Sequence, residues 1–184
     1  AEGKKVALIC YNRNLGNWLE RYFEDTPQNL RPAYVGTLHR FMIRLIKQSG
    51  MKLHFPNDDY EKEEFYAKDI PLYAKKAIQE LRVKFDKVIV DEAQDIISEN
   101  YLDVIDSCVH GGLSRGIWTM FGDFSQQAIY HSSGTGEGLI DILEARSSFV
   151  RFRLTVNCRN TKPICEEIVS VTGFEAPSDV WSKV

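Results

Sequence analysis

Two acidic residues follow a short apolar run near the middle of the chain. The run Lys87–Val90 is rich in β-branched residues, and Asp91 and Glu92 come directly after it. Such a run favours a central strand of a parallel sheet, which is buried on both faces. At its end Asp91 can hold Mg²⁺ through water, because Mg²⁺ takes few carboxylates and keeps several waters. Glu92 can polarise a water for attack on a phosphoryl group. An acidic start of a helix after a strand is the plainer interpretation.

A second polar segment follows the apolar run that ends at Phe121. Gly122 permits a tight turn, and Asp123 can brace the loop or the water shell of a metal. Gln126 offers an amide that can orient a water or contact a terminal phosphate. Tyr130, a little further on, can stack on a nucleic-acid base. The alternative is a capped turn into a helix, with the aromatic residue used for packing.

A cation follows the last apolar run. Arg159 carries a planar fork that suits phosphate oxygens, and an Arg near a transferring phosphoryl group stabilises its charge. A surface ion pair is the alternative.

Earlier in the chain, Thr37 stands where a strand is expected to pass into a helix. It can cap that helix, whose free amides can bind phosphate, while His39 can touch nucleic acid. A cap followed by core residues explains this segment equally well.

The elements that must position these residues alternate between strand and helix patterns, which predicts an α/β fold with a mainly parallel sheet flanked by helices. The expected strands are Lys5–Cys10, Ala33–Val35, Lys87–Val90, Ile117–Phe121 and Val150–Thr155. The expected helices are Leu15–Glu24, Leu38–Gln48, two segments within Glu61–Leu81, Glu99–Cys108, Leu139–Ala145 and Lys162–Thr172. Pro71 is expected to break the helical region that contains it. Because ligands bind at the carboxyl ends of parallel strands, the polar residues after each strand should share one edge.

Composition narrows the class of protein. The chain has 184 residues, 43% of them apolar, which is enough for one sizeable core and excludes general disorder. The net charge of −3 excludes a uniformly basic protein that coats DNA. No apolar run approaches the ~20 residues that a membrane span needs. The four cysteines form no C-x-x-C pair, so we expect free thiols and a cytoplasmic location rather than a zinc site.

Although the net charge is close to zero, two stretches of the sequence, called here the acidic strip and the basic strip, each carry charge of one sign. Between residues 88 and 106 every charged residue is acidic, and between 150 and 162 every charged residue is basic. The two strips suggest a cation site facing an anion site, with solvated surface as the alternative. The acids are Asp91, Glu92, Asp95, Glu99, Asp103 and Asp106, and the bases are Arg151, Arg153, Arg159 and Lys162.

Taken in order, the motifs resemble those of UvrD-like superfamily 1 DNA helicases. The matching segments are VALICYNRNLGNWL, GTLHRF, VIVDEAQD, GDFSQ and LTVNCRNT, and the resemblance runs from about Lys4 to Ile168. It implies a RecA-like P-loop NTPase fold that couples ATP hydrolysis, with Mg²⁺, to 3′-to-5′ movement on single-stranded DNA and duplex unwinding.

The resemblance also implies roles for single residues. Asp91 would bind Mg²⁺, and Glu92 would be the catalytic carboxylate. Gln126 would sense the γ-phosphate or its attacking water, and Arg159 would contact the γ-phosphate. The residues expected near DNA are Asn12, Thr37, His39 and Tyr130.

The sequence departs from the family pattern in several places. The phosphate-binding pattern G-x-x-x-x-G-K-[ST] is absent, since the glycine-rich stretch 134–138 carries no Lys. Motifs of a second RecA-like domain are absent too, and Tyr130 falls one residue later than expected. We therefore expect residues 1–184 to be a partial RecA-like domain that begins just after the P-loop and does not hydrolyse ATP alone. A reduced helical insertion is expected at about 51–84, and 160–184 can begin the next domain.

Two other functions remain open at this stage. One is a non-catalytic module that binds nucleic acid or protein and has lost the motor. The other is a metal-dependent nuclease that uses Asp91, Glu92 and Asp123, although the Gln and Arg motifs would then have no role.

Overall fold

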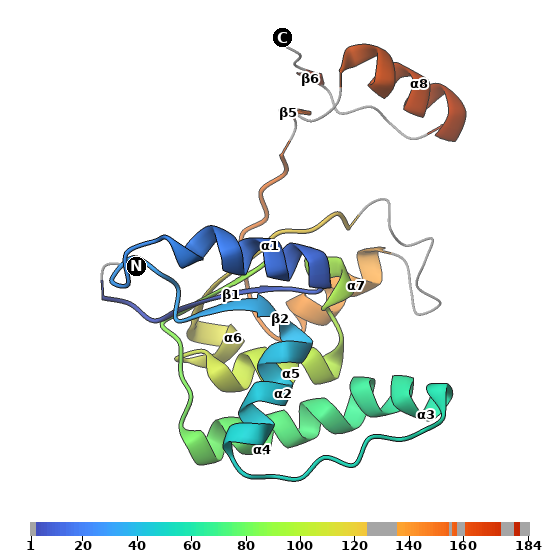
Figure 1. Cartoon of the computed structure of the whole chain (residues 1–184). Coiled ribbons are helices and arrows are strands. Elements are labelled where there is room, and N and C mark those ends of the chain that lie inside the picture. The colour runs from blue at the N-terminus through green and yellow to red at the C-terminus, as the bar shows by residue number, and fades with distance from the viewer. Residues whose placement is uncertain (1–2, 125–135, 155, 158–160, 174–178, 181–184) are drawn as a thin grey trace. The chain divides into compact units, whose positions relative to one another are not determined.

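The computed structural model describes the chain except for residues 1–2, 125–135, 155, 158–160, 174–178 and 181–184 (Figure 1). The chain divides into two compact units, Ala1–Ser148 and Phe149–Val184, each of which is described by itself.

Four parallel strands form the sheet of the first unit. They are β1 (Val6–Cys10), β2 (Tyr34–Thr37), β3 (Lys87–Val90) and β4 (Ile117–Met120). Their order is β2-β1-β3-β4, and every neighbouring pair is parallel. The bounds of β3 are those predicted from its β-branched run.

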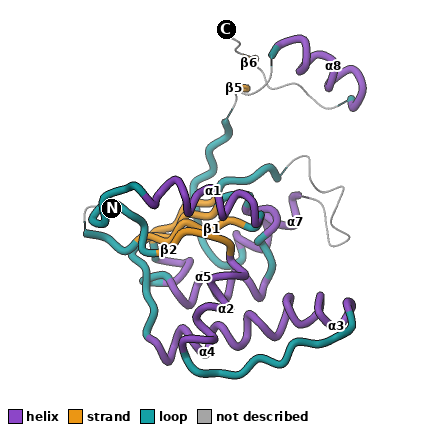
Figure 2. The backbone as a smooth tube through the Cα atoms, viewed as in Figure 1, coloured by secondary structure: helices purple, strands orange, loops and turns teal. Residues whose placement is uncertain are grey.

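Helices cover both faces of this sheet (Figures 1 and 2). On one face lies α1 (Arg13–Glu24), and on the other lie α2 (Leu38–Gln48) and α5 (Glu99–Cys108). Along the sheet, β2 lies on one side of β1 and β3 lies on the other side. Crossover connections between parallel strands are right-handed, so the helix between β1 and β2 and the helices between β2 and β3 lie on opposite faces. The predicted α/β fold with a parallel sheet flanked by helices is confirmed, and it is consistent with a RecA-like fold.

The core lies between the sheet and the layer that contains α2 and α5. Val88 and Val90 of β3 are fully buried, as are Ile46 of α2 and Ile105 of α5. The segment between α2 and β3 contains α3 (Asp59–Glu64), a π-helical turn η1 (Phe65–Asp69) and α4 (Ile70–Leu81). Helix α4 packs against α2 and α5, so this segment belongs to the same body as the sheet. The remaining helical elements of this unit are η2 (Ala93–Asp95), α6 (Gly112–Arg115) and α7 (Gly136–Glu144).

The prediction that Pro71 breaks the helical region is wrong, because α3, η1 and α4 follow one another without a gap. Proline has no N–H for the carbonyl four residues earlier, that of Ala67. Asn100 of α5 donates its side-chain amide to that carbonyl at 2.9 Å, and Tyr101 Oη lies 3.4 Å from the carbonyl of Tyr66. The switch to π-helical bonding just before Pro71 and these donors from α5 let the helix continue.

The prediction of a fifth sheet strand at Val150–Thr155 is also wrong. Residues 149–154 have no regular structure, and the apolar side chains of Phe152 and Leu154 are 88% and 86% exposed. The apolar alternation is typical of a strand, but a strand exists only where a neighbour takes its backbone hydrogen bonds. The second unit instead contains a two-stranded parallel pair and one helix. These are β5 (Val156–Asn157), α8 (Lys162–Thr172) and β6 (Asp179–Val180).

Within the described residues, no helix combines the length and apolar character needed to cross a bilayer. The cysteines described there, Cys10, Cys108 and Cys165, are buried thiols, and Cys158 lies outside the described residues.

Candidate functional site

The carboxyl ends of the four parallel strands bring several predicted residues to one edge of the sheet. Asn12 follows β1, Thr37 ends β2, Asp91 and Glu92 follow β3, and Asp123 lies beyond β4. The strand order reverses between β1 and β3, which is where ligands bind in open parallel sheets. At that point the backbone N–H of Asp91 donates to the carbonyl of Ile9 at 2.9 Å. We refer to these strand ends as the carboxyl edge.

The acidic pair turns sharply as it leaves β3. Glu92 has φ 52° and ψ 49°, a left-handed conformation that non-glycine residues rarely adopt. Its backbone N–H donates to Asp91 Oδ1 at 3.0 Å, which holds the two residues in one tight turn. Both are half-buried, so water reaches their carboxylates. Strained backbone of this kind is concentrated at functional sites.

The pair is suited to a hard cation held largely by water. One oxygen of Asp91 accepts from the Glu92 N–H, and Mg²⁺ uses carboxylate oxygens together with several waters. The described residues contain no group of three or more His, Cys, Asp or Glu side chains arranged to hold a metal.

Gln94 is a site residue that the sequence did not single out. Its side chain is only 4% exposed, although it is polar and lies one turn from the acidic pair. Its Nε2 donates to Glu92 Oε2 at 2.7 Å, and its Oε1 accepts from the backbone N–H of Asp123 at 3.2 Å. The amide thus joins the segment after β3 to the segment after β4. Nothing in the local sequence distinguishes a glutamine that becomes buried from one that stays in solvent.

Thr37 caps α2, as predicted. Its hydroxyl accepts from the backbone N–H of Arg40 at 3.2 Å, and the residue is 7% exposed. Asn12 is the N-cap of α1, where its Oδ1 accepts from the N–H groups of Asn14 and Leu15 at 2.8 and 3.1 Å. This cap explains why α1 begins two residues before the predicted start. The two capping residues differ in exposure: Thr37 is buried, whereas Asn12 is exposed at the carboxyl edge.

His39 lies inside a cluster of aromatic rings. Its Nε2 is 2.8 Å from the hydroxyl of Tyr101, and its ring lies 5.4 to 5.5 Å from the rings of Tyr11, Tyr66 and Tyr101. Burial lowers the pKa of His39, because the charged imidazolium would lose hydration there. Burial, followed by the nearby Tyr11, raises the pKa of Tyr101 to about 12. His39, on α2, therefore packs against Tyr11 after β1, Tyr66 of η1 and Tyr101 of α5.

A buried thiol lies beneath Asp91. Burial, followed by the charge of Asp91, raises the pKa of Cys10 to about 11. The Sγ atom lies 3.8 Å from the carbonyl of Gly36, to which it can donate. A thiol in this state is protonated at neutral pH, and Cys10 is fully buried in the core.

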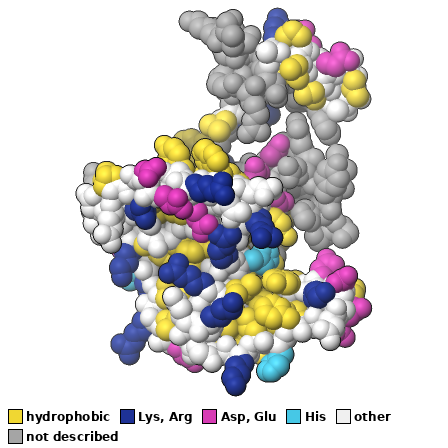
Figure 3. Space-filling view, in the orientation of Figure 1, with side chains coloured by type: hydrophobic (Ala, Val, Ile, Leu, Met, Phe, Trp, Pro, Cys, Tyr) yellow, Lys and Arg dark blue, Asp and Glu magenta, His cyan; other side chains and the backbone are white. Residues whose placement is uncertain are grey.

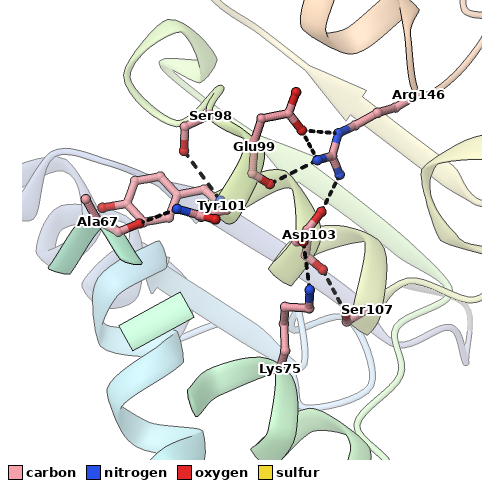
Figure 4. A network of polar contacts seen from close by, with 9 residues as sticks. Ala67, Lys75, Ser98, Glu99, Tyr101, Asp103, Ser107 and Arg146 are labelled. Carbon is pink, nitrogen blue, oxygen red and sulfur yellow. Dashed lines mark hydrogen bonds and ion pairs between the residues drawn. The ribbon is translucent and has the colours of Figure 1, made fainter. Parts of the chain in front are cut away.

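Part of the acidic strip has a structural role (Figure 4). Asp103 of α5 pairs with Arg146, just after α7, at 2.6 Å and with Lys75 of α4 at 2.7 Å. Glu99 also pairs with Arg146. Partial burial raises the pKa of Asp103, but the hydrogen bonds from Lys75 and Arg146 outweigh it and the pKa is lowered. These acids brace helices and are not part of the carboxyl edge.

On the face of the molecule in Figure 3, basic and acidic side chains are scattered among polar and apolar ones. The described residues on that face do not form a continuous basic stripe. Three predicted site residues, Gln126, Tyr130 and Arg159, lie outside the described residues, so their roles stay predictions.

Comparison with models of known protein families found no match, and comparison with curated proteins found none either. The motifs and the geometry of the carboxyl edge therefore carry the functional proposal.

Proposed function

We propose that this chain is part of an ATP-dependent DNA helicase of the UvrD-like kind, in which ATP hydrolysis drives 3′-to-5′ movement along single-stranded DNA and duplex unwinding. The observation that carries the proposal is the acidic pair Asp91–Glu92 at the carboxyl end of the central strand β3. Its second carboxylate is hydrogen-bonded through Gln94 to the segment after β4.

In this proposal the two carboxylates have separate roles. Asp91 would hold Mg²⁺ through water, and a bound Mg²⁺ would supply charge neutralisation for the phosphates of ATP. Glu92 accepts a proton from the attacking water, for which its half-buried carboxylate is placed at the edge where ligands bind. Gln126 orients that water, and Arg159 stabilises charge on the γ-phosphate, as the resemblance implies.

Single-stranded DNA is the proposed partner at the same edge. Asn12 is exposed there and can reach a phosphate or a base. Thr37 and His39 are largely enclosed, so we assign them the positioning of the surface around Tyr11 rather than direct contact. Tyr130 is proposed to stack on a base.

The 184 residues contain no P-loop lysine and no motifs of a second RecA-like domain. We propose that both are supplied by other parts of a longer parent protein. This chain by itself should therefore show no DNA-stimulated ATP hydrolysis, because the backbone cradle and the lysine of a P-loop supply most of the grip on phosphates. Robust turnover by the isolated chain would contradict this part of the proposal.

The decisive experiment uses the parent protein. Glu92→Gln should abolish DNA-stimulated ATP hydrolysis while nucleotide binding survives, because the amide keeps the shape of the side chain and cannot accept the proton. Glu80→Gln is the matched control, since Glu80 is an exposed acid on α4, and it should behave like the wild type. Near wild-type turnover in Glu92→Gln would refute the assignment. Cleavage of DNA with Mg²⁺ and without ATP would favour the nuclease instead.

A further inference from the structure

We propose that Gln94 is a positioning residue that fixes the Glu92 carboxylate against the segment after β4, so that hydrolysis depends on that segment. The inference rests on the proposed ATPase function and assigns a residue that has no role in it so far. It starts from burial: among the described residues, only Thr37 and Gln94 are polar and buried. Thr37 is explained by its cap, which leaves Gln94 as the buried polar group that needs a reason.

The chemistry of its partners determines how the amide is oriented. A carboxylate can only accept, and a backbone N–H can only donate. The NH₂ group of Gln94 must therefore face Glu92, at 2.7 Å, and its oxygen must face the N–H of Asp123, at 3.2 Å. A charged acceptor makes the first of these bonds the stronger one. One rigid amide thus holds a carboxylate on one segment and a backbone group on the other.

The surrounding backbone leaves this bridge little freedom. A Cβ built on Gly122 would lie 2.7 Å from Gln94 Oε1 and 3.0 Å from the ring of Phe124, so a side chain at position 122 would displace the amide. Close by, the N–H of Ala93 donates to the carbonyl of Phe121 at 2.8 Å, which extends the β3–β4 pairing past the end of the strands. The left-handed turn at Glu92 then directs the chain so that Gln94 can reach back to it.

Two consequences follow from the bridge. The Glu92 carboxylate stays in one position before a nucleotide arrives, and such preorganisation is where much of the rate of phosphoryl transfer originates. Movement of Gly122 and Asp123 is also transmitted to Glu92.

The first test needs no activity and uses this chain. Gln94→Leu should make the Asp123 amide exchange with deuterium about tenfold faster, because it loses its acceptor. The Phe121 amide, which donates to Val90 at 2.9 Å, should keep its wild-type rate. Gln79→Leu, at an exposed glutamine of α4, is the matched control. An unchanged Asp123 amide would overturn the bridge.

The second test measures ATP hydrolysis by the parent protein. Gln94→Leu and Gly122→Ala should each lower kcat on the order of 100-fold at nearly unchanged KM, as expected for a misplaced catalytic group. Gln94→Glu should be slow at neutral pH and gain activity relative to wild type as the pH falls, because its protonated side chain can donate to Glu92 again. An unchanged kcat or an unshifted pH profile would overturn the positioning role. A wild-type parent with no ATPase activity would instead refute the proposed function, and the exchange experiment would still decide the bridge.

Discussion

His39 should make folding of this chain depend on pH in a specific window. Burial lowers the pKa of His39 in the folded state, whereas in the unfolded chain the imidazole keeps a value near 6.5. Below about pH 6.5 the unfolded chain therefore binds more protons than the folded one, and stability is lost as the pH falls. Above that value both states are neutral at this position and its contribution is fully present.

The size of this pH effect on the free energy of unfolding is set by the single proton that His39 can bind. A single linked histidine changes the free energy of unfolding by at most about 1.4 kcal/mol per pH unit, between its folded pKa and 6.5. The ring of His39 is half-buried, so we take this slope as an upper limit. The rings that enclose it belong to Tyr11, Tyr66 and Tyr101.

The assay is urea unfolding followed by tryptophan fluorescence, repeated from about pH 5 to about pH 8, where a single buried histidine titrates. His39→Gln is the matched variant, because an amide can still bond the Tyr101 hydroxyl but does not titrate. The difference in unfolding free energy between wild type and variant should be constant above neutral pH and shrink below pH 6.5. Parallel curves for the two proteins over the whole range would refute the reasoning.

Three further predictions concern stability and can be read by the same unfolding assay. Ile105→Ala should cost about 2–5 kcal/mol because Ile105 is fully buried, whereas Ile117→Ala, at a residue 54% exposed, should cost far less; equal losses would place the core elsewhere. Thr37→Ala should cost about 1 kcal/mol through its cap, and Thr37→Ser should restore most of it; no rescue would mean that the hydroxyl is not the stabilising group. Arg146→Met should cost about 1 kcal/mol at low salt, and less at high ionic strength, because its ion pairs with Asp103 and Glu99 are partly exposed; a loss that does not depend on salt would indicate packing instead.

Elements whose local pattern and burial agree were predictable from the sequence. The β-branched run Lys87–Val90 became β3 with the predicted bounds, and α2 spans the predicted Leu38–Gln48 with Thr37 as its cap. The alternation of strands and helices also predicted a parallel sheet, and with it the shared edge at which Asn12 and Asp91 lie. These features depend on side-chain periodicity and on capping chemistry, which neighbouring residues determine.

The errors arose where a distant segment changes the local outcome. Pro71 is a helix breaker by local rules, yet Asn100 and Tyr101 supply donors to the carbonyls that it leaves free. Val150–Thr155 alternates like a strand, but residues 149–154 belong to none of the described strands. A sequence pattern shows which secondary structure a segment can form. Whether it forms depends on a distant segment that supplies the partner for each backbone hydrogen bond.

For the candidate site, the sequence by itself determined the residue types and their places: two carboxylates directly after a β-branched run, a threonine where a helix was expected to begin and an asparagine after the first expected strand. Only the tertiary structure decided how these groups are held. It brought the segments after β3 and β4 together through Gln94, enclosed His39 among aromatic rings and assigned Asp103 to a brace between helices. The physical reason is that burial and hydrogen-bond partnership are properties of pairs of residues far apart in the chain, and no local pattern encodes which pairs will meet.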